Sequence, residues 1–288
     1  PCDLLKNLEA QINESKRITV YKNSTVKECK GFIGNFKSII DNNGGDIEIE
    51  HGAAIIAIGA NESKQDEYLY GKNKKVHTQL ELEELIEKDP DFAKSLNEVV
   101  MIQCVGSREP DNMMCSRVCC TEAIKNAISI KKANPKANVA ILYRDVRTYG
   151  FKEQYYNKAR ELGVLFFRYD PDGKAVVSQN SSGDLDVRIE DLNSGLNLSF
   201  SPDVLALSVA MAPATDNETI GLVFKVPVNL QGFFLEAHMK LRPVDFASDG
   251  FFLCGACHSP KFIDESISQA QAVAARAARI LSADVMEV

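Results

Sequence analysis

The chain of 288 residues lacks long apolar segments, clustered positive charge and the usual glycine fingerprint for nucleotides. Its longest apolar runs, such as 53–58 and 204–207, have strand length and are too short to cross a bilayer. The net charge is −7 and no block of Lys or Arg occurs, which argues against a nucleic-acid surface. No two of the 17 glycines are separated by a single residue, so Gly-x-Gly-x-x-Gly is absent.

Cysteine, by contrast, is plentiful, with eight residues. The first residues show no basic-then-apolar start, so we expect no export signal. Eight cysteines in an acidic protein that is not exported indicate metal or redox work in a reducing compartment, rather than a disulfide framework. We therefore expect a cytoplasmic protein.

Four cysteines crowd into seventeen residues, at Cys104, Cys115, Cys119 and Cys120. Four thiolates are the usual count for a cubane iron–sulfur cluster, and the polar loop 107–114 is long enough to curl around one. Cys119 and Cys120 open an expected helix, 119–132, whose first N–H groups can donate to cluster sulfurs. The spacing matches neither a common ferredoxin run nor a zinc finger. Buried free thiols are the alternative, which explains one or two cysteines better than four in a loop.

From residue 98 the expected elements alternate between strand and helix. They are the strand 99–103, the helix 119–132, the strand 139–143, the helix 151–162 and the strand 164–169. This βαβαβ order is typical of a doubly wound, nucleotide-domain-like sheet. The cysteine loop occupies the strand–helix junction at which such a domain would carry its glycine fingerprint.

The flanking segments contain too few elements for two separate cores. The first part offers a strand at 18–21, an Asn-Gly hairpin turn at 42–45 and an apolar strand at 53–58. A helix at 79–87 begins with a capping-box pattern at Thr78 and Glu81. The last seventy residues add a strand at 251–254 and a helix at 264–282. We therefore predict that residues 1–96 and 216–288 form one discontinuous domain and that 97–215 are inserted into it.

Six further segments have a distinctive sequence: Cys104-Val-Gly-Ser-Arg108, Cys115-Ser-Arg-Val-Cys-Cys120, Tyr143-Arg-Asp-Val-Arg-Thr-Tyr-Gly150, Gly232-Phe-Phe-Leu-Glu-Ala-His238, Lys240-Leu-Arg-Pro-Val-Asp245 and Phe252-Leu-Cys-Gly-Ala-Cys-His-Ser-Pro-Lys261. Together they resemble the A-subunit family of heterodisulfide reductase, the flavin and iron–sulfur electron-transfer subunits of methanogens and other anaerobes. The resemblance implies an α/β fold of two Rossmann-like, thioredoxin-reductase-like domains, one inserted into the other. It also implies one [4Fe-4S] cluster on the four clustered cysteines.

The resemblance further implies contacts with FAD. Val26 would approach the adenine side, and Gly59 would lie at the second FAD-contacting turn. Gly255 and Ala256 fall where related flavoproteins have Gly-Asp, although Ala256 cannot make the hydrogen bond of that Asp. Ser266 and Ile267 would offer backbone N–H groups to the flavin O2.

Lys125 resembles a family lysine near the flavin N5, where a cation would stabilise reduced, anionic flavin. The alternative for Lys125 is a solvated helix lysine. Family members begin with a strand–Gly-x-Gly-x-x-Gly–helix unit, whereas this chain starts partway through the FAD domain. Either it is a fragment or another polypeptide supplies the missing part, and we expect weak FAD binding by this chain alone.

The leading hypothesis is an oxidoreductase component that relays electrons between FAD and the cluster, with substrate chemistry on a partner. The implied partners are the other subunits of a heterodisulfide-reductase-like complex, a hydrogenase or another electron donor, and a second copy of the chain. Flavin-based electron bifurcation stays open. One alternative is a pyridine-nucleotide-disulfide-reductase-like enzyme using Cys254 and Cys257, whose spacing suits a redox dithiol or half a metal site. The other is a non-catalytic assembly module.

Overall fold

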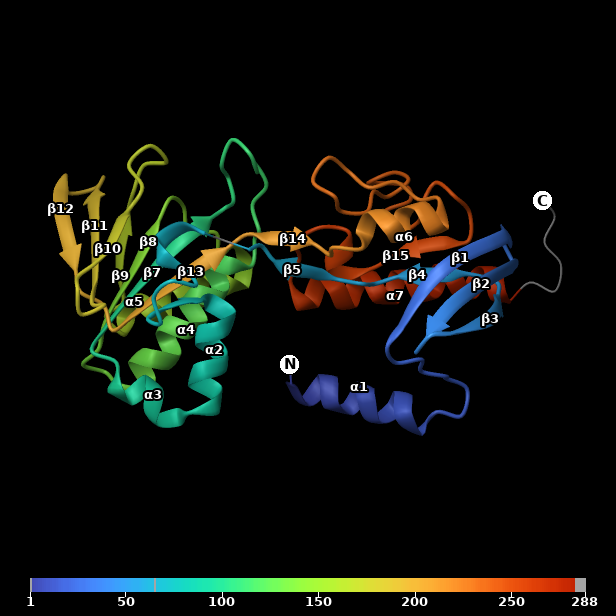
Figure 1. Ribbon diagram of the computed structural model, residues 1–288, viewed down its shortest axis with the longest axis horizontal. Coiled ribbons are helices and arrows are strands. Elements are labelled where there is room, and N and C mark those ends of the chain that lie inside the picture. Colours follow the sequence, from blue (N-terminus) through green and yellow to red (C-terminus); the bar gives the residue numbers. More distant parts are fainter. Residues whose placement is uncertain (1, 65, 283–288) are drawn as a thin grey trace.

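The computed structural model describes residues 2–64 and 66–282. The molecule is elongated, with two lobes placed end to end (Figure 1). The chain passes between the lobes through β5 (Ala60–Glu62) and returns through β14 (Met211–Pro213), and these strands pair antiparallel. We call this pair the waist, residues 66–210 the cysteine lobe, and residues 2–59 with 214–282 the terminal lobe.

The cysteine lobe is built on a parallel sheet with the strand order β6-β13-β7-β8-β9. Its strands are β6 (Val76–Thr78), β7 (Glu98–Val105), β8 (Asn138–Tyr143), β9 (Leu165–Arg168) and β13 (Val204–Val209). Every residue of β13 is buried, and so is every residue of β7 except the first. Continuous apolar strands are what a parallel sheet covered on both faces requires.

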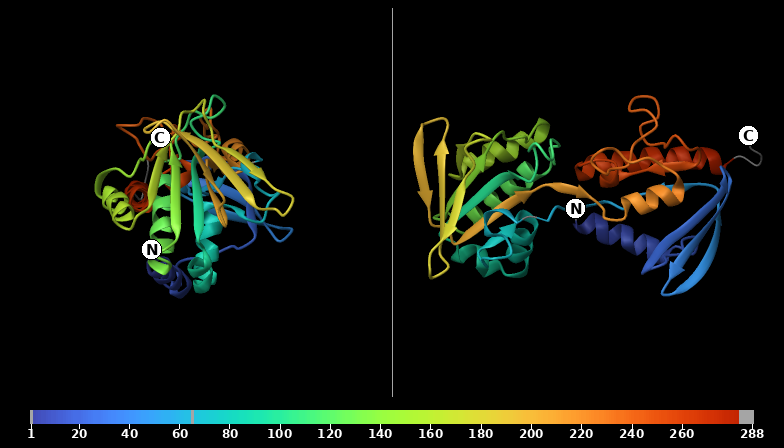
Figure 2. Two further views of the ribbon diagram at one scale, coloured as in Figure 1. Left: turned by 90° about the vertical axis from the view of Figure 1, so that its left-hand side faces the viewer. Right: turned by 45° about the horizontal axis from the view of Figure 1, so that its top comes forward.

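Helices cover one face of this sheet and a second sheet covers the other. The helices are α2 (Gln79–Lys88), α3 (Pro90–Ser95), α4 (Cys119–Ala133) and α5 (Glu153–Glu161), and their apolar residues share one core with the sheet. The second sheet is the antiparallel β10 (Val176–Gln179), β11 (Leu185–Asp191) and β12 (Leu196–Phe200), on the outer side of the lobe (Figure 2). The expected capping box is present, since the Thr78 hydroxyl accepts from the Glu81 N–H at 3.2 Å.

The terminal lobe begins with α1 (Cys2–Glu14) and a three-stranded antiparallel meander. Its strands are β1 (Ser24–Phe32), β2 (Asn35–Asn42) and β3 (Gly45–His51). The expected Asn-Gly hairpin turn joins β2 to β3, with positive φ at both Asn43 and Gly44. The expected strand at 18–21 is wrong: these residues are irregular and exposed, because a strand needs a pairing partner and no described strand lies beside them.

The core of the terminal lobe surrounds a short parallel pair, β4 (Ala54–Ile56) and β15 (Phe251–Leu253). Aromatic residues dominate this core, among them Phe36, Phe224, Phe234, Phe246 and Phe251. The helix α6 (Asn217–Phe224), which the sequence analysis did not anticipate, packs here. The long α7 (Ile263–Leu281) packs through Val273 and Ala277 against Val244 and Phe252.

The first predicted domain boundary, at residue 97, comes too late along the chain. The strand β6 precedes it, yet β6 pairs with β13 in the sheet of the cysteine lobe. The helix α2 likewise places Leu82 in the core of that sheet. A short strand without a distinctive pattern gives no signal of its partner, which is why the boundary was misplaced. We therefore propose that the inserted unit begins near residue 66.

Candidate functional site

The four clustered cysteines meet where β7 gives way to α4. Cys104 is the penultimate residue of β7, Cys119 and Cys120 are the first two residues of α4, and Cys115 lies in the connecting loop. The carboxyl end of a strand in a doubly wound sheet is the usual place for a ligand. Cys104, Cys119 and Cys120 are buried and Cys115 is half-buried.

The backbone around these cysteines is strained. Cys104, Arg108 and Arg117 all have positive φ, at 63°, 59° and 60°. Each such non-glycine residue costs on the order of 1–3 kcal/mol, and such strain gathers at functional sites. Hydrogen bonds hold the loop in this shape, including Arg108 N–H to Met114 O at 3.2 Å and Asn112 Nδ2 to Gly106 O at 3.0 Å.

The four sulfurs influence one another electrostatically. A hydrogen bond from Cys119 lowers the pKa of Cys120 to about 7, and the same bond, with burial, raises the pKa of Cys119. The charges of Cys104 and Cys115 raise the pKa of Cys119 further. Burial, followed by the charge of Cys120, raises the pKa of Cys104. Four thiolates in this space would repel one another, so deprotonating them together requires positive charge between them.

The cysteines do not form a ready-made site for a single metal ion. Within residues 2–64 and 66–282, no three His, Cys, Asp or Glu side chains are grouped so that they could hold one metal ion. A cubane cluster would need the four sulfurs within about 7 Å of one another, each about 2.3 Å from an iron. The first turn of α4 has no side-chain cap, which leaves its N–H groups for sulfur. The Arg117 N–H already donates to Cys115 Sγ at 3.4 Å.

A cavity of about 460 Å³ lies beside the cysteines, between the lobes. Its lining comes from the start of α4, the waist and the start of α7: Ala60, Asn61, Glu62, Leu80, Ser116, Val118, Cys119, Thr121, Glu122, Lys125, Val209, Ala210, Met211, Lys261, Phe262 and Ile263. A mainly apolar lining with a few charged groups is typical of a cavity that takes an organic ligand. Because Cys119 is part of the lining, a ligand here would lie next to the cysteine cluster.

The charged groups of the cavity are perturbed by burial. Burial raises the pKa of Glu122 to about 7, and the charge of Glu62 adds to this. Burial also lowers the pKa of Lys261. Lys125 lies at the cavity and its ammonium forms an ion pair with Glu83. The Lys125 side chain is 47% exposed, so the lysine is a largely solvated group with a counter-charge beside it.

The residues expected at FAD lie mostly outside this cavity. Gly59 and Gly255 follow the paired strands β4 and β15, and both have positive φ, at 73° and 76°. A Cβ added at Gly59 would meet nothing within 4 Å, so this turn leaves room for a ligand. Ala256 belongs to the 3-10 turn η3 (Gly255–Cys257), and Val26 packs on the terminal-lobe core.

The expected role of Ser266 and Ile267 as helix-terminal donors is wrong. The helix α7 begins at Ile263, and the Ser266 N–H already donates to Phe262 O at 2.9 Å. The unpaired amides of a helix belong to its cap and first three residues, so Ile267 lies inside the bonded region. The structure instead places Ile263, the first helical residue, at the cavity.

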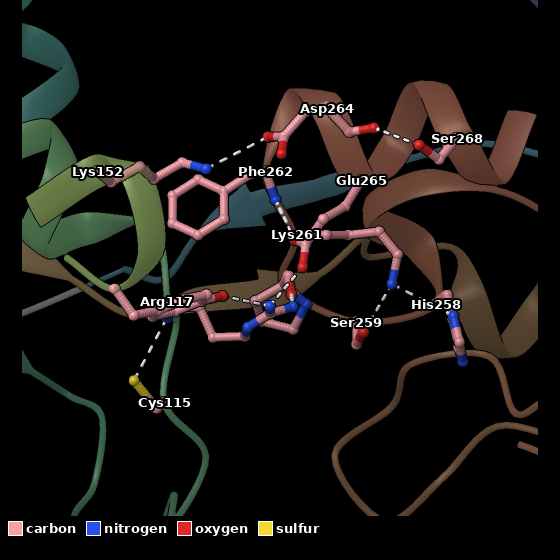
Figure 3. A network of polar contacts seen from close by, with 12 residues as sticks. Cys115, Arg117, Lys152, His258, Ser259, Lys261, Phe262, Asp264, Glu265 and Ser268 are labelled. Carbon is pink, nitrogen blue, oxygen red and sulfur yellow. Dashed lines mark hydrogen bonds and ion pairs between the residues drawn. The ribbon is translucent and has the colours of Figure 1, made fainter. Parts of the chain in front are cut away.

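Sequence reasoning missed the residues that join the cysteine loop to α7 (Figure 3). The Arg117 guanidinium donates to Pro260 O at 3.0 Å, to Tyr149 Oη at 2.5 Å and to Glu265 Oε1 at 2.5 Å. The Lys152 ammonium lies 4.0 Å from the centre of the Phe262 ring. Arg117 sits within the motif Cys115-Ser-Arg-Val-Cys119, but its partners are too distant in sequence for the motif to reveal them.

The Cys254–Cys257 pair looks structural in this fold. Cys257 is fully buried, and its Sγ lies 3.2 Å from Ile56 O and 3.1 Å from Cys254 O, so its single proton is shared between two carbonyl acceptors. Burial raises the pKa of both thiols, which disfavours the thiolate that thiol exchange requires. A disulfide between them would also remove the Cys257 thiol proton that these two carbonyl groups accept. The geometry therefore argues against the dithiol-reductase alternative.

Comparison with known proteins relates the chain to one group of curated sequences. No family model matches the chain. It is 39% identical over 258 residues to the second iron-sulfur A-subunit of the CoB–CoM heterodisulfide reductase of Methanopyrus kandleri, covering 84% of this chain and 39% of that protein. It is 35% identical over 272 residues to the A-subunit of the ferredoxin:CoB-CoM heterodisulfide reductase of Methanosarcina acetivorans, covering 80% and 34%. The chain thus spans between a third and two fifths of these relatives' length.

Solved structures agree on the fold. The thioredoxin reductase of T. acidophilum matches with a TM-score of 0.58 and 17% identity, covering 97% of this chain and 79% of that one. The thioredoxin reductase of Lactococcus lactis matches with a TM-score of 0.57 and 17% identity, covering 90% and 74%. The predicted α/β, thioredoxin-reductase-like fold is therefore confirmed. Identities this low say nothing about activity.

Proposed function

Because this chain is homologous to a segment of the heterodisulfide reductase A-subunit family, we propose that it is the cluster-bearing part of an electron-transfer oxidoreductase. In this proposal Cys104, Cys115, Cys119 and Cys120 ligate one [4Fe-4S] cluster, and FAD binds in the space between the lobes. The observation that carries the proposal is the position of Cys119, at the start of α4, in the lining of a mainly apolar cavity. A one-electron carrier and an organic redox cofactor would then lie side by side.

The chain's own residues would bind and shield the cluster. Bound there, the cluster would accept and release single electrons. The four thiolates would hold it, and the Arg117 N–H and the uncapped turn of α4 would donate hydrogen bonds to sulfur. Burial of Cys104, Cys119 and Cys120 would keep water away from the sulfurs. Burial and hydrogen bonding are the protein's means of setting a cluster's potential.

Residues from both lobes would orient FAD, which exchanges electrons singly or in pairs. Gly59 and Gly255 would give it room at the ends of β4 and β15, with Ala256 beside Gly255 in η3 and Val26 toward the adenine side. Lys125 would supply positive charge at the flavin ring, and Lys261 would do so from the other lobe. This chain has no glycine fingerprint for the FAD pyrophosphate. Binding of the pyrophosphate would therefore depend on the part of the relatives that this chain does not span.

We also propose the wider setting from the relatives. Their names describe subunits of CoB-CoM heterodisulfide reductases, some with ferredoxin or H2 as reaction partners. By this analogy the chain would work with other subunits of such a complex, with a hydrogenase or other electron donor, and flavin-based bifurcation would be one mode of operation. All seven cysteines whose side chains the structure describes are free, which supports a reducing, cytoplasmic setting. No helix among the described residues is long and apolar enough to cross a membrane.

The deciding experiment is anaerobic reconstitution with iron and sulfide, followed by metal analysis and electron paramagnetic resonance. We expect four irons per chain and a cluster signal on reduction. Cys104→Ser and Cys119→Ser should lose or degrade the cluster, whereas Cys29→Ser, a buried cysteine in the other lobe, should load like the unmodified chain. An iron-free chain after reconstitution, or equal loading of all variants, would contradict the proposal.

A further inference from the structure

We propose that Arg108 sets the reduction potential of the cluster through direct contact with Cys104, and that Asp145 limits this effect. The inference rests on the proposed function, because it requires a cluster on the four cysteines. The inference does not concern which residues ligate the cluster or bind flavin. It concerns the charge that sets how readily the cluster accepts an electron. Arg108 acts here as a tuning residue rather than as a ligand.

The side-chain geometry of Arg108 links a sulfur to a carboxylate. Its Nη1 lies 4.0 Å from Cys104 Sγ, and its Nη2 donates to Asp145 Oδ2 at 2.6 Å. The Arg108 side chain is 23% exposed and that of Asp145 is 45% exposed. The cation is therefore more shielded from water than its counter-charge. A charge that is less exposed to water interacts more strongly with its neighbours, because the local dielectric constant is lower.

The backbone fixes Arg108 in this place. It has a φ of 59°, and its N–H donates to Met114 O at 3.2 Å. Its carbonyl accepts from Nη1 of the buried Arg144 at 2.8 Å. Cys104 itself has a φ of 63°. Both ends of the guanidinium–sulfur contact are thus held in left-handed backbone, which would relax to ordinary conformations if nothing in the loop required them.

The guanidinium groups of the other arginines near the cysteines bind other partners. The guanidinium of Arg117 binds Tyr149, Glu265 and Pro260, and only its backbone N–H reaches a sulfur. Arg144 pairs with Glu109, and Arg147 lies 3.7 Å from Asp145. Among the residues that the structure describes, Arg108 is the cation whose side chain makes a hydrogen-bond contact with a cysteine sulfur.

The sign of each effect follows from charge. Reduction adds one electron, and hence one negative charge, to the cluster and its thiolates. A guanidinium beside Cys104 stabilises that added charge and favours reduction, whereas the Asp145 carboxylate opposes it. Removing the cation should lower the potential, and removing the carboxylate should raise it. A purely structural role for the pair would not give shifts of opposite sign.

The test is a redox titration of the reconstituted chain, followed by electron paramagnetic resonance and absorbance. The variants are Arg108→Gln, Arg108→Lys and Asp145→Asn. The matched control is Arg188→Gln, which removes an exposed arginine paired with Asp186 in the outer sheet. For Arg108→Gln we expect the equilibrium constant for reduction to fall roughly tenfold, or about 59 mV for one electron. Arg108→Lys should retain most of the wild-type value, Asp145→Asn should shift the opposite way, and Arg188→Gln should not differ.

Several outcomes would overturn the inference. The inference fails if the reduction potential of Arg108→Gln equals that of the control Arg188→Gln. It also fails if Arg108→Gln and Asp145→Asn shift the potential in the same direction. If Arg108→Gln does not load a cluster, Asp145→Asn decides, and an unchanged or lowered potential in it rejects the idea. Failure of the unmodified chain to load would reject the proposed function itself, whereas loaded variants with unaltered potentials reject the role of Arg108 alone.

Discussion

Arg117 and Glu265 form an ion pair with a separation of 2.5 Å that joins the cysteine loop to the first turn of α7. Glu265 also accepts from the Phe262 N–H through its other oxygen at 2.8 Å, which ties the pair to the start of the helix. The two residues belong to different lobes. The loop that carries Cys115 is therefore bonded directly to the lobe that carries the β4–β15 pair.

Removing this ion pair should loosen both segments. We expect Arg117→Met to increase amide hydrogen exchange at residues 115–118 and at the first turn of α7, because three hydrogen bonds of one side chain are lost together. Both side chains are about one-third exposed, so the loss of stability should be only about 1 kcal/mol. Lys158→Met, which breaks an exposed pair with Glu161 within α5, is the control. Unchanged exchange at both segments in Arg117→Met would refute this linkage.

His258 should be a neutral imidazole with its proton on Nε2. Its Nδ1 faces two donors, Lys261 Nζ at 3.3 Å and Gln269 Nε2 at 3.0 Å, so it must accept, and Nε2 then donates to Glu236 at 2.8 Å. Nitrogen NMR should show this tautomer in the folded chain, with the exposed His238 as a reference in the same spectrum. A ring protonated at Nδ1 at neutral pH would contradict the assignment.

The same histidine should make stability depend on pH. Burial lowers the pKa of His258 below 6.5, although Glu236 opposes the shift. The unfolded chain therefore binds a proton that the folded chain does not, and the free energy of unfolding should fall as the pH drops below about 6.5. His258→Gln should flatten this part of a thermal-melting series between pH 5 and 8. An identical slope in the variant would show that other groups govern it.

Gly31 should be far less tolerant of a methyl group than Gly44, although both have positive φ in the same meander. A Cβ at Gly31 would lie 2.2 Å from Asn35 O, whereas one at Gly44 would meet nothing within 4 Å. Gly44→Ala should cost about 1 kcal/mol from backbone strain alone. Gly31→Ala should cost clearly more, because backbone must move as well. Equal melting temperatures for the two variants would disprove the steric part of the argument.

FAD should bind this chain weakly or not at all when no other polypeptide is present. Pyrophosphate binding needs closely approaching glycine backbone at a helix N-terminus, and the sequence has no such fingerprint. A flavin absorbance titration measures this directly. Sub-micromolar affinity of the isolated chain would mean that the turns at Gly59 and Gly255, with the cavity, are sufficient.

The elements with strong local signals were predictable, and those that depend on distant partners were not. The buried strands β7 and β13, the Asn-Gly turn and the Thr78 capping box each show their pattern within a few residues. The strand β6 is too short to reveal that it pairs with a strand more than a hundred residues later. The four cysteines could be singled out because they crowd into seventeen residues, whereas the contacts of Arg108 with Asp145 and of Arg117 with Glu265 exist only once the chain has folded.

The waist has a mechanical consequence. Both passages of the chain between the lobes are strands, and they are paired at three positions, from Met211 with Glu62 to Pro213 with Ala60. Neither passage can bend without the other, so the ladder restricts the lobes to swinging about a common hinge instead of moving independently. The cavity that contains Cys119 and Lys261 lies beside this hinge, and its walls come from both lobes. A small swing would therefore change the distance between the start of α4 and the start of α7, and with it the width of the cavity between them.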